Sequence, residues 1–121
     1  MSKLLVYGTA IFFLIYGAVF IAYPVEMAHW VTGSSPATSV SLIDFRATYG
    51  GAQLSIGVIL LLLMKLRADI DFALVIVATS LLLMAVGRTV GILVDGQASV
   101  LMFAYLAAEL GFGVLALFLR R

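Results

Sequence analysis

The sequence predicts an all-α integral membrane protein: a four-helix bundle with both termini in the cytoplasm and a short interfacial helix after the first span. Three observations carry this prediction. Of the 121 residues, 64% are apolar and 11% are charged, whereas a soluble domain is about 45–50% apolar and about 25% charged. Four apolar segments approach the ~20 residues that cross ~30 Å of hydrocarbon. The basic residues fall on one side of these segments.

The composition excludes several classes of protein. A water-soluble monomer of this length could not bury so much apolar side chain, because small domains bury only about two-thirds of their surface. The net charge of +1 gives no field that would attract nucleic acid. The absence of cysteine excludes disulfides, thiolate metal sites and a cysteine nucleophile.

A single domain is expected over residues 1–121. Its predicted spans cover residues 4–23, 42–64, 72–94 and 100–119. We interpret the first as a membrane helix and not as a signal peptide, because its apolar run exceeds the ~7–15 residues of a signal core and only Lys3 precedes it.

A short helix over residues 25–31 is expected between the first two spans. Pro24 suits the start of this helix and Gly33 its end. Tyr23 and Trp30 carry amphipathic rings that suit the headgroup level of a membrane. This helix is therefore predicted to lie at the interface.

Polar residues mark the ends of the later spans. Ser41-x-x-Asp44 reads as a capping box for the second span. Asp69 begins the third span, where a helix dipole favours negative charge. Asp95-Gly96-Gln97 reads as a tight turn, and Ser99 is a plausible N-cap for the fourth span.

Loop charge predicts the orientation in the membrane. With four spans, both termini and the 64–71 loop lie on one side. That side holds every loop and terminal cation of the chain: Lys3, Lys65, Arg67, Arg120 and Arg121. The loops 24–41 and 95–99 hold no Lys or Arg. The positive-inside rule then places both termini in the cytoplasm.

Polar side chains inside three spans form the predicted ligand-binding site. They share the outer half of the membrane: Arg46, Tyr49 and Gln53 on the second span, Arg88 on the third, and Tyr105 and Glu109 on the fourth. An α-helix places positions i, i+3 and i+7 on one face, and likewise i and i+4. Intramembrane charges cost roughly 2.5–3.5 kcal/mol on insertion scales and commonly mark function.

The charges in this group suggest particular pairs. Similar depths favour Arg88 with Glu109, and Arg46 with Asp44 or Asp95. Arg46 has the alternative of reaching outward to lipid phosphates. The alternative for Arg88 and Glu109 is a pair that only holds helices together.

Three further residues are assigned structural or site-rim roles. Asp44 is expected as a cap and Asp95 as a turn residue or site residue. His29 is expected as an interfacial side chain, with a proton relay or a lid over the outer cavity as the alternatives. Neither a metal site nor a cofactor is expected, because one histidine without cysteine leaves only scattered carboxylates. No catalytic motif is present.

Small residues spaced by four predict close helix packing. The motifs are Gly51-x-x-x-Ser55, Gly87-x-x-x-Gly91 and Ala107-x-x-x-Gly111. Packing within the bundle and contact between two copies are both consistent with them.

The stretches Asp44-Phe45-Arg46-Ala47-Thr48-Tyr49-Gly50-Gly51 and Gly87-Arg88-Thr89-Val90-Gly91, with Asp95-Gly96 and Glu109, carry a family resemblance. The chain resembles a domain-of-unknown-function family of small bacterial four-helix membrane proteins, DoxX-like in size and layout. The resemblance implies a multi-pass protein of the bacterial inner membrane whose polar motif residues face one another. It implies no established activity.

The function expected from the sequence is non-enzymatic: an outward-facing polar pocket for a lipid or other amphipathic molecule. The alternatives are an accessory or scaffold subunit of a larger membrane complex and, less favoured, a proton-coupled transporter or membrane enzyme that uses Glu109 and Arg88. Membrane lipids are the expected partners. A larger complex or a second copy is the alternative, and nucleic acid is not expected.

Overall fold

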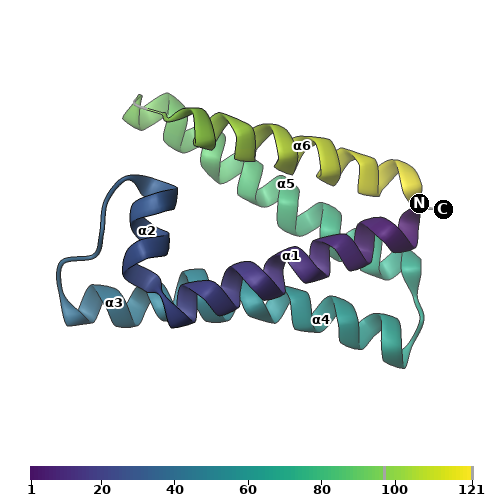
Figure 1. Cartoon of the computed structure of the whole chain (residues 1–121). Coiled ribbons are helices and arrows are strands. Elements are labelled where there is room, and N and C mark those ends of the chain that lie inside the picture. Colours follow the sequence, from purple (N-terminus) through teal and green to yellow (C-terminus); the bar gives the residue numbers. More distant parts are fainter. Residues whose placement is uncertain (97, 121) are drawn as a thin grey trace. The chain divides into compact units, whose positions relative to one another are not determined.

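The computed structural model describes residues 1–96 and 98–120, and these residues contain helices and no strand (Figure 1). The elements in chain order are α1 (Ser2–Ala22), α2 (Pro24–Thr32), α3 (Ser39–Phe45), the π-helix η1 (Arg46–Gly51), α4 (Ala52–Leu66), α5 (Ile70–Asp95) and α6 (Val100–Leu119). They form two compact units, which are Tyr7–Leu66 and the combination of Met1–Val6 with Arg67–Arg121.

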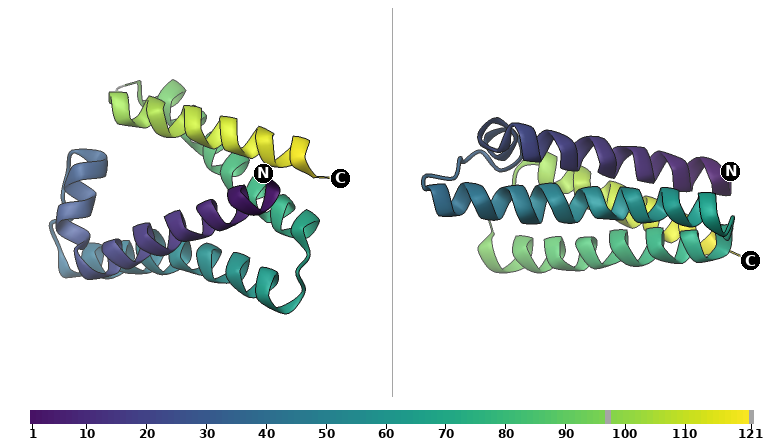
Figure 2. Two further views of the ribbon diagram at one scale, coloured as in Figure 1. Left: turned by 45° about the vertical axis from the view of Figure 1, so that its right-hand side comes forward. Right: turned by 90° about the horizontal axis from the view of Figure 1, so that it is seen from below.

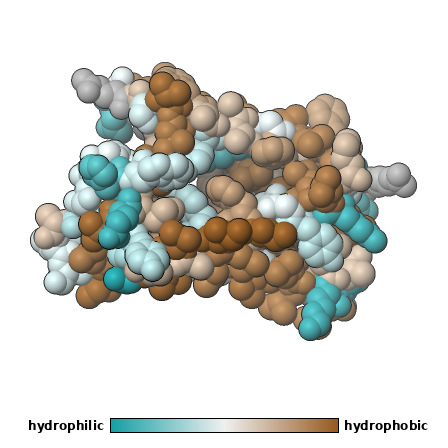
Figure 3. Space-filling model, viewed as in Figure 1, coloured by the Kyte–Doolittle hydropathy of each residue, from teal (hydrophilic) through white to brown (hydrophobic). Residues whose placement is uncertain are grey.

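The four predicted spans are confirmed as helices. The helical segments long and apolar enough to cross a membrane are Ser2–Ala22, Ser39–Leu66, Ile70–Asp95 and Val100–Leu119. Their ends differ from the predicted ones by up to three residues. Large apolar side chains remain exposed along them, for example Leu93 and Phe118. Hydrophobic residues, brown in Figure 3, cover much of the face that it shows. Such surfaces suit hydrocarbon and not water.

The second span is continuous from α3 through η1 to α4. In the π-helix the backbone hydrogen bonds join residues that are five positions apart. The N–H of Ala52, for example, donates to the carbonyl of Ala47. This wider turn shifts the phase of everything that follows it. The prediction that Arg46, Tyr49 and Gln53 share one face assumes an uninterrupted α-helix. That spacing does not hold across η1.

Within Tyr7–Leu66, glycines let α1 approach the second span closely (Figure 2). A Cβ at Gly17 would lie 2.5 Å from the Leu54 nitrogen and 2.6 Å from the Gly50 oxygen. A Cβ at Gly57 would lie 2.7 Å from the Ala10 oxygen. Cβ atoms essentially never lie this close to backbone atoms of a neighbouring helix, because the atoms would overlap. Glycine is therefore required at both positions.

The predicted small-residue motifs are not the ones that make the close contacts described here. A Cβ at Gly87 or Gly111 would meet nothing within 4 Å in the described residues, and one at Gly51 would meet only the Arg46 oxygen at 3.8 Å. In α6 the close contact is at Gly113, where a Cβ would lie 2.8 Å from the side chain of Leu82. Spacing alone does not say which glycine faces a partner.

The second unit contains the hairpin of α5 and α6 (Figure 1). Its ends are capped largely as predicted. An Asp69 carboxylate oxygen accepts from the Phe72 N–H at 2.9 Å, and the Ser99 hydroxyl accepts from the Met102 N–H at 3.3 Å. Gly96 ends α5 in the left-handed region with φ 77°. The third residue of the predicted turn, Gln97, lies outside the described residues.

The caps of the first unit confirm one prediction and correct another. The helix after Pro24 ends at Gly33, whose φ is 76° and whose N–H donates to the His29 carbonyl at 2.8 Å. The predicted Ser41–Asp44 capping box is wrong. Thr38 is the N-cap of α3 and its hydroxyl accepts from the Ser41 N–H at 3.1 Å, because the helix begins three residues earlier than expected.

Candidate functional site

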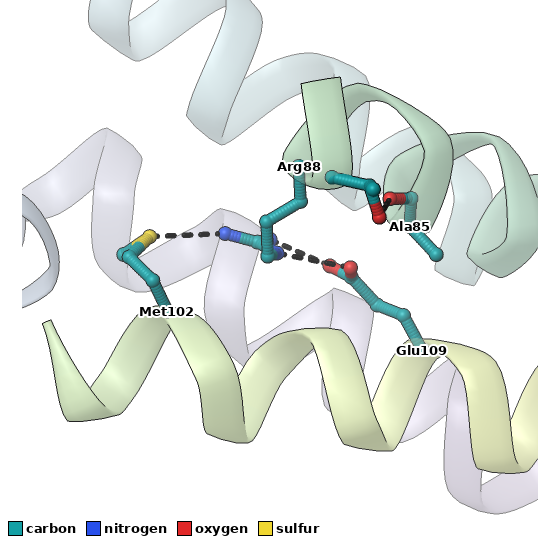
Figure 4. A network of polar contacts seen from close by, with 5 residues as sticks. Ala85, Arg88, Met102 and Glu109 are labelled. Atoms are coloured by element: carbon teal, nitrogen blue, oxygen red, sulfur yellow. Dashed lines mark hydrogen bonds and ion pairs between the residues drawn. The ribbon is translucent and has the colours of Figure 1, made fainter. Parts of the chain in front are cut away.

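Arg88 and Glu109 form an ion pair between α5 and α6, as the sequence predicted (Figure 4). The Arg88 Nε donates to Glu109 Oε2 at 2.9 Å, and Nη2 donates to Oε1 at 2.5 Å. Two parallel bonds of this kind are the strongest geometry between guanidinium and carboxylate. The pair joins neighbouring helices of one unit.

Two more side chains of α6 surround the same guanidinium. Arg88 Nη1 donates to the sulfur of Met102 at 3.2 Å, as Figure 4 shows. The Arg88 Cζ lies 5.1 Å from the centroid of the Tyr105 ring, within the range of a cation–π contact. The expectation that Tyr105 and Glu109 share a helix face is thereby confirmed, since both contact one arginine.

Both side chains of the ion pair are largely buried in the protein. The side chain of Glu109 is 9% exposed and that of Arg88 is 23% exposed. A lone charge buried to this extent would be costly, whereas two charges in bidentate contact satisfy each other. This geometry gives Arg88 and Glu109 a structural role between α5 and α6.

Arg46 lies in the other unit and has a different environment. Its Nη1 donates to the main-chain carbonyl of Ile21, one residue before the end of α1. The last four carbonyls of a helix lack intrahelical donors, and a cation is favoured at that end. Both Arg46 and Asp44 are among the described residues, and no ion pair joins them. Of the two predicted partners of Arg46, Asp44 is therefore wrong, because the side chain donates to a carbonyl instead. The alternative partner, Asp95, belongs to the other unit, and that pairing stays a prediction.

Aromatic rings form a continuous row along α1 and onto η1. Along α1 the ring centroids of Phe12 and Tyr16 are 5.5 Å apart, and those of Tyr16 and Phe20 are 5.1 Å apart. Tyr49 of η1 extends the row, 5.2 Å from Phe20 and 4.8 Å from Phe45. Tyr49 therefore acts first as a packing residue between α1 and η1.

The remaining predicted residues lie as follows. Gln53 is half-buried at the start of α4. Asp44 is exposed in α3, and its main-chain carbonyl accepts from the Thr48 hydroxyl at 2.7 Å. Asp95 is exposed as the last residue of α5, and His29 is exposed on α2.

The six residues of the predicted pocket divide between the two units. Three belong to Tyr7–Leu66 and three to the unit that contains α5 and α6. The structure brings together Arg88, Tyr105 and Glu109. A common pocket for all six stays a prediction.

Sequence reasoning missed two contributors to these sites. Met102 was not among the predicted site residues, although its position seven residues before Glu109 puts both on one face of a helix. The Ile21 carbonyl was also missed. A signal for it was Pro24, which begins the next helix and so marks the end of α1, where the last carbonyls lack intrahelical donors.

The other end of the second unit carries a hollow of about 480 Å³, lined by Ser2, Ala68, Asp69, Ile70, Asp71 and Leu119. None of the predicted site residues lines it. Among the described residues no group of three His, Cys, Asp or Glu could hold a metal ion.

Four apolar spans and a charged pair inside the last two define a multi-pass membrane protein. The chain belongs to the family described as Domain of unknown function (DUF4345), which it matches over residues 1–120. This confirms the expected membership of an uncharacterised family. No curated protein and no solved structure matches the chain.

Proposed function

We propose that this protein binds an anionic amphipathic molecule in the membrane, with the headgroup at Arg46 and the apolar part along the neighbouring spans. The observation that carries the proposal is the environment of Arg46. Its side chain is exposed, and it is held at the end of α1 by one carbonyl and not by the carboxylate of Asp44, which lies two residues earlier in the sequence.

The chemistry of Arg46 suits an oxyanion. A guanidinium offers five N–H donors in a planar fork that matches phosphate and carboxylate. One of them reaches the Ile21 carbonyl, which fixes the position of the side chain. The π-helix that carries Arg46 supports the same proposal, because π-helical turns occur frequently at functional sites.

Apolar and aromatic side chains provide surroundings for a tail. Tyr49 and Phe12 remain partly exposed along the aromatic row, and Ile43 is exposed one turn from Arg46. Small-molecule sites commonly combine such apolar walls with a few polar groups. The ligand class is therefore a single-chain or double-chain lipid with a phosphate or carboxylate.

We further propose that both termini are cytoplasmic, that the protein resides in the bacterial inner membrane, and that α2 lies at its outer surface. The basic residues support the orientation. The exposed ring of Trp30 and the buried Ala28 and Val31 support an interfacial α2, because one side faces protein and the other carries an amphipathic aromatic.

One observation favours the rival function of an accessory or scaffold subunit. The Arg88 guanidinium is engaged by Glu109, Met102 and Tyr105 of its own chain. If Arg46 behaved in the same way, the polar residues would serve only to hold helices together, and the exposed helix faces would contact a larger membrane complex.

Native mass spectrometry in mild detergent separates the two functions. Phosphatidylglycerol, palmitate and neutral phosphatidylcholine are added in turn to the wild type, to Arg46→Gln and to the matched control Arg67→Gln. We expect an anionic lipid to bind in preference to phosphatidylcholine. Loss of one charge-assisted contact of about 1.5–3 kcal/mol lowers binding at least about tenfold in Arg46→Gln and leaves Arg67→Gln unchanged.

The phosphatidylglycerol and palmitate arms identify the headgroup as phosphate or carboxylate. Equal binding by the wild type and Arg46→Gln would overturn the proposal. Co-purification of a larger membrane protein, with no bound lipid, would support the scaffold function.

A further inference from the structure

The sulfur of Met102 lies against a cation. Arg88 Nη1 donates to it at 3.2 Å, while Nε and Nη2 of the same guanidinium contact the Glu109 carboxylate (Figure 4). A thioether is a weak hydrogen-bond acceptor. The Nη1 group of Arg88 thus donates to a sulfur atom that accepts hydrogen bonds only weakly.

We propose that Met102 is an oxidation site for hydroperoxides and that Arg88 holds the resulting sulfoxide. A sulfur lone pair attacks one oxygen of hydrogen peroxide and the O–O bond breaks. The second oxygen leaves as water after proton transfer. The sulfur is oxidised by two electrons, the peroxide is reduced, and the products are methionine sulfoxide and water.

The location of Met102 gives a peroxide access to the sulfur. Met102 is the third residue of α6, in the first turn after the Ser99 N-cap, and it is half-buried. Met64 offers the contrast, because it is 7% exposed near the end of α4. Met1, which is 80% exposed, provides a reference for unhindered reaction.

The neighbourhood of Met102 also determines what oxidation does to the fold. Sulfoxide formation normally disrupts an apolar site, because it places a polar oxygen there without a partner. Here the partner is already in place, since Arg88 Nη1 points at the sulfur. The methionine side chain has rotatable bonds that let the new oxygen turn toward that donor. The bonds to Glu109 use the other two nitrogens and need not break.

The test uses the full chain in lipid nanodiscs treated with hydrogen peroxide. Peptide mass mapping follows oxidation at each methionine, and the thermal midpoint is measured before and after treatment. We expect sulfoxide at Met102 while Met64 remains a thioether. The fall in thermal midpoint after treatment should be no larger in the wild type than in Met102→Leu. This comparison subtracts the effect of oxidising the other methionines.

Arg88→Lys supplies the decisive comparison, because an ammonium keeps the charge opposite Glu109 without the forked donors. Oxidation should lower the midpoint of Arg88→Lys by more than that of the wild type. Met102→Gln tests the same point without oxidant, since its side-chain oxygen should leave the protein at least as stable as Met102→Leu. Met102 unmodified at a dose that converts Met1, or an equal midpoint loss in wild type and Arg88→Lys, would overturn the proposal.

Discussion

Removing either member of the Arg88–Glu109 pair should destabilise the protein, and by unequal amounts. Breaking a buried ion pair by removing one partner costs about 3–5 kcal/mol, because the remaining charge loses its compensation. Arg88→Ala leaves the carboxylate of Glu109, which is 9% exposed, and falls in that range. Glu109→Ala leaves a guanidinium that is 23% exposed and long enough to reach outward, so its cost is smaller.

The double variant should cost less than the sum of the two single variants, with a coupling energy of about 1–3 kcal/mol. The unfolding free energy is measured on protein in dodecyl maltoside by titration with sodium dodecyl sulfate, followed by helical circular dichroism. Arg67→Ala, a change in a cation outside the helices, is the control and should have little effect. Additive costs, within ~0.5 kcal/mol, would refute the pairing.

The remaining predictions concern packing, orientation and the interface. Gly17→Ala should lower the unfolding free energy by about 1–3 kcal/mol, because the new methyl group would overlap with backbone atoms. Gly8→Ala, whose Cβ would meet nothing within 4 Å in the described residues, should raise it by about 0.5–1 kcal/mol. The same sodium dodecyl sulfate titration compares the two variants. A membrane-impermeant thiol reagent should label Ser35→Cys but not Ala68→Cys in intact cells, and the reverse result would invert the orientation. Trp30 fluorescence should be quenched most by lipids brominated near the headgroup, and absence of quenching by any brominated lipid would contradict an interfacial α2.

Local chemistry made much of the fold predictable. The spans follow from runs of apolar residues. The helix starts at Asp69 and Ser99 follow from side chains that accept from backbone N–H groups three residues on, and the end at Gly33 follows from a glycine whose backbone adopts the left-handed conformation. The Arg88–Glu109 pair was also predictable. Two opposite charges at similar depth in consecutive spans have few alternatives to each other in a membrane.

Tertiary contacts determined what the sequence could not show. The close approach of Gly17 to Gly50 joins residues 33 positions apart, and no spacing rule selects these glycines over Gly87 or Gly111. The π-helix at Arg46–Gly51 has no local sequence signal, yet it changes the face on which later residues lie. Arg46 donates to the Ile21 carbonyl because of where the end of α1 lies relative to η1, and the sequence does not show that position.

The surroundings of Arg46 distinguish a ligand-binding site from a purely structural contact. An experimental structure of the wild type in nanodiscs that contain phosphatidylglycerol would show them. The proposed function predicts an elongated density whose headgroup lies within hydrogen-bond distance of the Arg46 guanidinium, with the Ile21 contact retained. A guanidinium without such density, paired instead with a protein carboxylate, would contradict the ligand site and favour the scaffold function.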